Sequence, residues 1–140
     1  MPALKVGEVA KRAGVNLQTI HYYERRGLLS KPPRTGANYR AYPADAVLRV
    51  RFVKRAQELG FTLKEIKELL SLRAAPRTRC ADVRQRATAK VQDIDAKVRT
   101  LQAMRKALTK LVGECSSEGP VTQCPILEAL DADETTNAAR

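Results

Sequence analysis

At 140 residues the chain is long enough for one small domain with an extended element, and too short to enclose a large active site. The net charge of +11 is uneven: residues 1–55 carry twelve Lys or Arg against three Asp or Glu, and residues 114–140 carry one Arg against six acids. A basic amino-terminal part fits nucleic acid better than an acidic substrate. No stretch has signal-peptide or membrane-spanning character, so we expect a cytoplasmic protein with no membrane partner.

Two short helices around a glycine turn are predicted at the amino terminus. Apolar residues recur at helical spacing from Val6 to Ala13, and Gly14 breaks the run. Asn16 can cap a second helix that ends at Gly27. This pattern predicts a helix-turn-helix, whose second helix enters the major groove of DNA. The candidate DNA-reading residues on that helix are Gln18, Thr19, His21, Tyr22 and Arg25, and Ile20 and Tyr23 are expected to face inward.

The stretch KPPRTGANYRAY after Leu29 predicts a small hairpin or wing, because paired prolines precede a Thr-Gly-Ala-Asn turn between basic and aromatic flanks. Arginine and tyrosine in such a loop can bond DNA backbone oxygens and set register. The candidate DNA-binding residues in the wing are Arg34, Asn38, Tyr39 and Arg40. Taken alone, each has an ordinary explanation, and for His21 a plain surface histidine is the favoured one. The ordered set is what indicates DNA binding.

Two further helices complete the predicted DNA-binding domain, residues 1–73. The third begins at Pro43 and Asp45 and ends at Gly60. The fourth begins with a capping box formed by Thr62 and Glu65. Their apolar faces are expected to comprise Val47, Val50, Val53, Ala56 and Leu59 in the third helix and Ile66, Leu69 and Leu70 in the fourth.

A long helical pattern runs from Cys80 to Gly113, after a linker in which Pro76 marks the boundary. Its apolar residues are spaced by three and four, with Arg105 interrupting the seam: Ala87, Val91, Ile94, Val98, Leu101, Leu108 and Val112. So narrow a stripe is typical of a two-stranded coiled coil, and no second long apolar helix in the chain could cover it. The alternative is a helix packed back on its own domain. We expect a mainly all-α homodimer with residues 74–113 as linker and dimerisation helix.

Cysteines flank this helix, with Cys80 at its start and Cys115 and Cys124 after its end. The helix ends would lie about 50 Å apart, so Cys80 cannot easily meet its own chain's Cys115. An antiparallel partner helix would bring the second chain's Cys80 beside Cys115 and Cys124, which predicts a three-thiolate site shared by two chains. Residues 114–140 are expected to form a metal-binding loop, a short helix from Cys124-Pro125 to Leu130 and a disordered tail.

Thiolates select soft ions such as Hg(II), Cu(I), Cd(II), Pb(II) and Zn(II) over hard cations. Structural zinc normally takes four ligands, often with histidine, yet the one histidine, His21, lies in the DNA-reading helix. Three sulfurs suit a three-coordinate soft ion and favour Hg(II), with Pb(II), Cd(II) and Zn(II) as alternatives. Three unrelated buried cysteines, or a redox switch through a Cys115–Cys124 disulfide, are less favoured alternatives.

The segment KVGEVAKRAGVNLQTIHYYERRGLL, followed by NYRAY, RVRFVKRAQELGFTLKEIKELL and the coiled-coil pattern, resembles the MerR family of transcription regulators over nearly the whole chain. The resemblance implies that Tyr22, Tyr39 and Arg40 touch DNA. It also implies a homodimer that binds a promoter, represses without metal, and activates by distorting the DNA for RNA polymerase. His21 is a departure, because the family usually has Arg there, and a histidine carries little charge near neutral pH.

The cysteine positions match the mercury-responsive members of the family, in which Cys80 of one chain would join Cys115 and Cys124 of the other. Copper-responsive members lack a cysteine at the helix start, so Cys80 argues against copper. Two other classes are disfavoured. A thiol enzyme needs a base near its cysteine, and no histidine is near in sequence, so we expect no catalytic residues. A drug-sensing regulator needs a larger domain than the 27 residues from 114 to 140.

Overall fold

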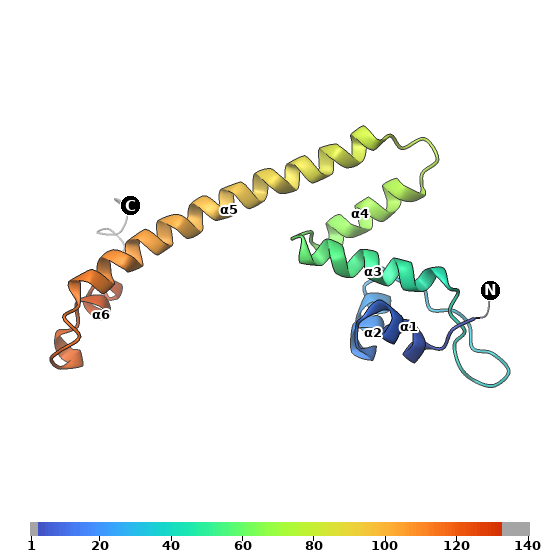
Figure 1. Cartoon of the computed structure of the whole chain (residues 1–140), viewed down its shortest axis with the longest axis horizontal. Helices are drawn as coiled ribbons and strands as arrows, with labels where there is room; N and C mark the ends of the chain where they lie inside the picture. The colour runs from blue at the N-terminus through green and yellow to red at the C-terminus, as the bar shows by residue number, and fades with distance from the viewer. Residues whose placement is uncertain (1–2, 133–140) are drawn as a thin grey trace. The chain divides into compact units, whose positions relative to one another are not determined.

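The computed structural model describes residues 3–132, and all the regular secondary structure in that range is helical (Figure 1). The chain divides into two compact units, Met1–Lys90 and Val91–Arg140, which we call the amino-terminal and carboxy-terminal units. The helices are α1 (Val6–Ala13), α2 (Leu17–Arg25), α3 (Asp45–Glu58), α4 (Leu63–Ala74), α5 (Cys80–Glu114), the 3₁₀ helix η1 (Val121–Gln123) and α6 (Pro125–Leu130). The predicted mainly all-α fold is confirmed.

The core of the amino-terminal unit lies where α1 packs against α2 and α3, and where α4 packs against α3. Its most buried side chains are Val9, Ile20, Leu28, Tyr42, Val50, Val53 and Ile66. Fully burying each of the aliphatic ones stabilises the fold by about 1.5–3 kcal/mol. The predicted apolar face of α3 is confirmed from Val47 to Ala56 and wrong at Leu59, which is 51% exposed. Leu59 is the carboxy-terminal cap of α3, so its side chain has left the buried face.

The turn between α1 and α2 forms as the sequence predicts. Gly14 ends α1 in the left-handed conformation, with φ +74°, and Lys54 Nζ donates to the Gly14 carbonyl at 2.9 Å. The side chain of Asn16 accepts from the backbone N–H of Thr19 at 2.8 Å and caps α2. Both devices satisfy backbone groups that a helix end leaves without an intrahelical partner. The Lys54 bond also joins α3 to the turn between α1 and α2.

Replacing Gly14 by alanine is expected to destabilise the protein by about 1 kcal/mol, because an L residue is strained in the left-handed region. Space is not the cause, since the nearest atom to an added Cβ would be Lys54 Nζ at 3.5 Å. Urea unfolding at one fixed dimer concentration measures the difference. Gly36→Ala is the control, because Gly36 has open space around it, and we expect a change within about 0.5 kcal/mol. Equal midpoints for the two variants would contradict this account.

The predicted wing is a short loop closed by backbone pairing and not by extended strands. Isolated antiparallel bridges join Arg34 to Arg40 and, at its base, Leu4 to Tyr42. The Thr35 N–H donates to the Tyr39 carbonyl at 2.7 Å, and Asn38 takes the left-handed conformation with φ 65°. The wing is therefore attached at its base to the chain that enters α1.

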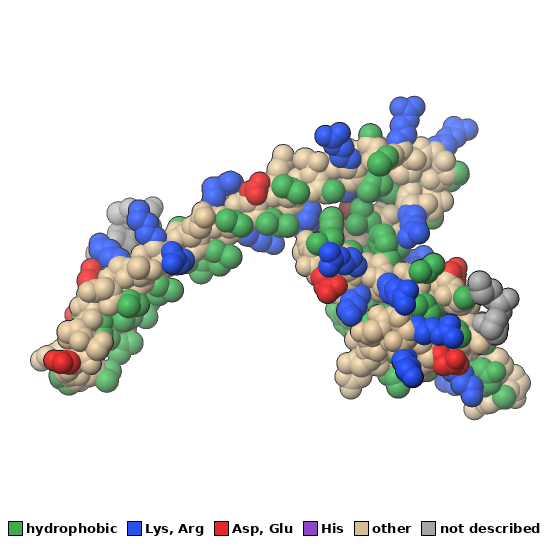
Figure 2. Space-filling model, in the orientation of Figure 1, with side chains coloured by type: hydrophobic (Ala, Val, Ile, Leu, Met, Phe, Trp, Pro, Cys, Tyr) green, Lys and Arg blue, Asp and Glu red, His purple; other side chains and the backbone are tan. Residues whose placement is uncertain are grey.

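The long helix is confirmed as one continuous element, α5, which runs one residue beyond its predicted end at Gly113. Its apolar stripe is exposed in the single chain (Figure 2). The exposed apolar residues of this stripe in the carboxy-terminal unit are Val91, Ile94, Val98, Leu101, Met104, Leu108 and Val112. An exposed row of this size needs a partner surface to bury it.

The segment after α5 contains the predicted short helix. Ser117 and Gly119 take positive φ values in the loop, and η1 follows. Cys124 is the amino-terminal cap residue of α6 and Pro125 its first residue, a position that proline favours. The predicted disordered tail lies outside the described residues. No helix in residues 3–132 is long and apolar enough to cross a membrane.

Candidate functional site

Helix α2 presents the predicted DNA-reading residues outward. Ile20 and Tyr23 are buried as predicted, and the Tyr23 hydroxyl donates to Gln57 Oε1 at 2.7 Å. Burial is the main cause that raises the pKa of Tyr23, with the Glu58 charge adding to it, so its phenol stays neutral. The opposite face exposes Gln18, His21, Tyr22 and Arg25. Arg25 lies over the Tyr22 ring, 5.9 Å from its centre, so the two present one surface that is both cationic and aromatic.

Thr19 is less available than its neighbours. It is half-buried, and its hydroxyl donates to Asn16 Oδ1 at 2.9 Å, alongside the backbone capping bond. The Asn16 side chain therefore holds two groups of Thr19. This places Thr19 in the cap of α2 as well as beside the reading face.

Glu24 is a buried residue of α2 that the sequence did not single out. Its carboxylate is 1% exposed, accepts from the Tyr42 hydroxyl at 2.7 Å through Oε2, and lies 3.2 Å from His21 Nδ1 through Oε1. Burial first, and then the bond to Glu24, raise the pKa of Tyr42. Glu24 thus ties the reading helix to the base of the wing and orients the His21 ring. The hydrogen bond to Tyr42 joins residues eighteen positions apart, so the sequence alone does not show this link between α2 and the wing.

The wing residues divide into exposed and supporting ones. Tyr39 is 39% exposed, and Lys5 Nζ lies 4.8 Å from the centre of its ring. Arg40 is half-buried and donates to the Pro32 carbonyl at 2.6 Å, so it braces the wing from inside. Arg34 is exposed and donates to the Asn38 carbonyl at 3.4 Å. Lys5 was not among the predicted residues, although its place just before the first helix, in a basic segment, was a usable signal.

Basic residues of α3 brace the helix-turn-helix from behind. Arg49, Arg51 and Lys54 donate to the carbonyls of Leu28, Arg12 and Gly14 at 3.0, 2.7 and 2.9 Å. Figure 2 shows Lys and Arg side chains gathered over the helices of the amino-terminal unit. The positive charge predicted for this part of the chain therefore lies on its folded surface, where it can attract a polyanion.

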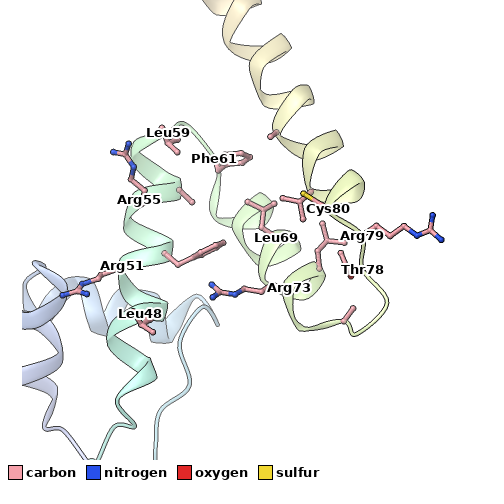
Figure 3. A pocket seen from close by; sticks show the side chains of 16 residues that line it. Leu48, Arg51, Arg55, Leu59, Phe61, Leu69, Arg73, Thr78, Arg79 and Cys80 are labelled. Carbon is pink, nitrogen blue, oxygen red and sulfur yellow. The ribbon is translucent and has the colours of Figure 1, made fainter.

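The three cysteines are all free thiols, distributed between the two units. Cys80 is exposed and belongs to the amino-terminal unit, where it lines a cavity of about 800 Å³ with Phe61, Leu69 and Arg73 (Figure 3). Cys115 and Cys124 are half-buried, at the two ends of the loop in the carboxy-terminal unit. Within residues 3–132 of the single chain, no three Cys, His, Asp or Glu side chains lie close enough to hold one ion. The donors are sulfurs, which suit a soft ion.

Two family models match this chain: "MerR HTH family regulatory protein" over residues 4–72 and "MerR, DNA binding" over residues 47–111. A mercuric resistance operon regulatory protein of Bacillus cereus is 40% identical over 126 residues, which are 90% of this chain and 96% of that protein. The chain belongs to the MerR family. As a MerR-family protein it is a DNA-binding transcription regulator, and the predicted resemblance is confirmed.

Two solved structures of MerR-family regulators are similar along most of their length. The dual function regulator MerR of Bacillus megaterium MB1, in complex with mercury(II), has a TM-score of 0.71 and 36% identity, covering 92% of this chain and 100% of that one. PbrR691 of Ralstonia metallidurans CH34, in complex with lead(II), has a TM-score of 0.80 and 33% identity, covering 91% of this chain and 98% of that one. Both relatives were solved with a soft metal ion.

Proposed function

We propose that this MerR-family regulator is a Hg(II)-responsive switch. It binds promoter DNA in the cytoplasm as a homodimer, represses without metal, and activates by distorting the DNA for RNA polymerase when three cysteines close around the ion. The observation that carries the proposal is that Cys80 is the first residue of one continuous α5, Cys115 directly follows its last residue, and Cys124 caps α6 after the loop. The 40% identity to a mercuric resistance regulator supports the choice of ion.

The metal site is shared between subunits in this proposal. A 35-residue helix rises about 50 Å, so α5 separates Cys80 from Cys115 of the same chain. The exposed apolar stripe of α5 gives each subunit a surface for an antiparallel partner. In that arrangement Cys80 of one subunit meets Cys115 and Cys124 of the other, and the dimer holds two equivalent three-sulfur sites.

The DNA interface in this proposal combines α2 with the wing. Gln18, Tyr22 and Arg25 meet base edges and phosphates, and Thr19 contributes beside the cap of α2. The wing adds Arg34, Asn38 and Tyr39 to the phosphate contacts, and Arg40 holds the wing in position through Pro32. The Nδ1–H of His21 donates a hydrogen bond to Glu24 Oε1, since a carboxylate only accepts, and this leaves Nε2 as the ring atom that DNA can reach.

Competitive metal titration tests the proposed effector. The purified dimer is titrated with Hg(II), Pb(II), Cd(II) and Zn(II) in the presence of a competing thiol, and the sulfur coordination of the bound ion is measured by X-ray absorption. We expect two Hg(II) per dimer, each bound by three sulfurs, and the highest affinity for Hg(II). If the dimer binds Pb(II) more tightly than Hg(II), lead would be the proposed effector in place of mercury, as the lead-bound relative suggests. Metal-independent oxidation of Cys115 and Cys124 to a disulfide would instead favour a redox sensor.

A further inference from the structure

Lys90 stands apart from every other residue of α5. Across this helix, all of which the structure describes, it is the one buried side chain, with only 7% exposed. Burying an ammonium group costs free energy unless it is paired. A leucine or methionine at this position would have met no such cost, so the presence of lysine requires a contact that only a cation makes.

That contact is made to the amino-terminal end of α4. Lys90 Nζ lies 2.8 Å from Glu65 Oε1 and 5.7 Å from the centre of the Phe61 ring. Glu65 is itself held in place, because Oε1 accepts from the Thr62 N–H at 2.8 Å in the capping box of α4. Lys90 therefore binds a carboxylate whose position is fixed by the backbone of another helix. We call Phe61, Thr62, Glu65 and Lys90 the α4–α5 clamp.

The electrostatics of the clamp agree with its geometry. The Lys90 ammonium group and, after it, the Thr62 N–H donate to Glu65 and lower the pKa of its carboxyl to about 2. The Glu65 carboxyl is therefore ionised at neutral pH. A second pair, Arg86 with Glu68, joins the same two helices one turn away in each; its side chains are 50% and 36% exposed, whereas those of Lys90 and Glu65 are 7% and 39% exposed. Such an exposed pair contributes little on its own, so Lys90 is the principal polar attachment of α5 to the DNA-binding helices.

We propose that Lys90 is a positioning residue for the metal response: the α4–α5 clamp locks the first turns of α5 to α4, so that a movement of α5 on metal binding is passed to the DNA-binding helices. This inference rests on the proposed metal-responsive function. Coupling of this kind requires that the two sites share an element whose position both of them bias. If the clamp is broken, the metal site should still bind metal and the DNA-binding helices should still bind DNA. Metal binding should then no longer change the state of the DNA-binding helices.

Lys90→Met tests this in the full-length dimer, with HgCl₂ under a competing thiol, a promoter fragment selected in vitro by the protein itself, and RNA polymerase. We expect Hg(II) stoichiometry and DNA affinity close to wild type, and a ratio of transcription with metal to transcription without metal that falls on the order of tenfold. Glu65→Gln should act in the same direction, because glutamine keeps the capping acceptor and removes the charge. Lys90→Arg should restore most of the response, since it keeps the cation.

Lys97→Met is the matched control, because it removes another ammonium of α5 that pairs with Asp93 at 3.2 Å but is 68% exposed. It should respond like wild type. Wild-type induction in Lys90→Met and Glu65→Gln alike would overturn the inference and leave the metal switch intact. If Lys90→Met does not fold, the Glu65→Gln result decides. A wild-type protein that binds no Hg(II) and gives no induction would overturn the proposed function, and the inference with it.

Discussion

Cys80→Ser is expected to lower the affinity of the dimer for Hg(II) at least about 100-fold and to abolish induction, while promoter binding without metal stays intact. Each proposed site loses one of three thiolates, and even residues that only support a ligand are worth 10–100-fold in metal affinity. Promoter binding should survive because Cys80 is exposed and is not one of the buried core residues of the amino-terminal unit. Competitive titration against a thiol and a filter-binding assay measure the two quantities separately.

Mixed dimers separate a shared site from one confined to a single chain. A dimer of one Cys80→Ser chain and one Cys115→Ser chain, each with its own affinity tag, keeps one complete shared site. The intact Cys80 of the second chain meets the intact Cys115 and Cys124 of the first. A site confined to one chain would be broken in both subunits. We therefore expect one tightly bound Hg(II) per mixed dimer and none in either homodimer.

Thr78→Ala is the control for the cysteine series, because Thr78 lines the same cavity as Cys80 and carries no thiol. Its Hg(II) affinity should match that of wild type. A mixed dimer that binds no Hg(II) tightly, beside a wild-type dimer that binds two, would contradict the shared site. Three-sulfur coordination that persists in the Cys80→Ser homodimer would contradict the role of Cys80 itself.

The helices of this protein were predictable because their signals are local. Gly14, Asn16 and the Thr62 and Glu65 capping box each act within a few residues, and each end forms as the sequence indicates. The stripe of α5 was equally readable, since its period is set along a single helix. The prediction that Leu59 lies on the buried face was wrong because apolar periodicity does not show at which residue a helix ends. Leu59 caps α3, and its side chain is exposed.

The contacts that position the site were not predictable, because they join residues far apart in sequence. In the sequence Glu24 is an ordinary acidic residue at a helix end, and only the fold shows its hydrogen bond to Tyr42. Lys90 is likewise one of many basic residues of α5, and only the fold shows its ion pair with Glu65. Lys5 acquires a role only where the wing brings Tyr39 back to the start of the chain. Each is a polar group in a position set by tertiary packing, which single-sequence patterns do not encode.

Leu101→Asp is expected to convert the dimer into monomers at micromolar concentration. Leu101 is 61% exposed in the single chain and lies in the middle of the α5 stripe. A two-fold interface uses each stripe residue twice, so losing the burial of two leucines costs at least about 3 kcal/mol, roughly 10²-fold in the dimer dissociation constant. The buried carboxylates add further cost. Sedimentation velocity across a concentration series measures the change.

Promoter affinity should fall with the dimer, because a monomer engages one half-site and loses the gain from two linked contacts, which is about 10²-fold or more. Ala103→Asp is the matched control: it adds the same charge two residues away, on the helix face opposite the stripe, where the side chain is also exposed. It should remain dimeric and bind promoter DNA like wild type. If Leu101→Asp stayed dimeric at micromolar concentration, the stripe would not be the dimer interface, and the pairing that brings Cys80 to the partner's loop would have to be sought on another surface.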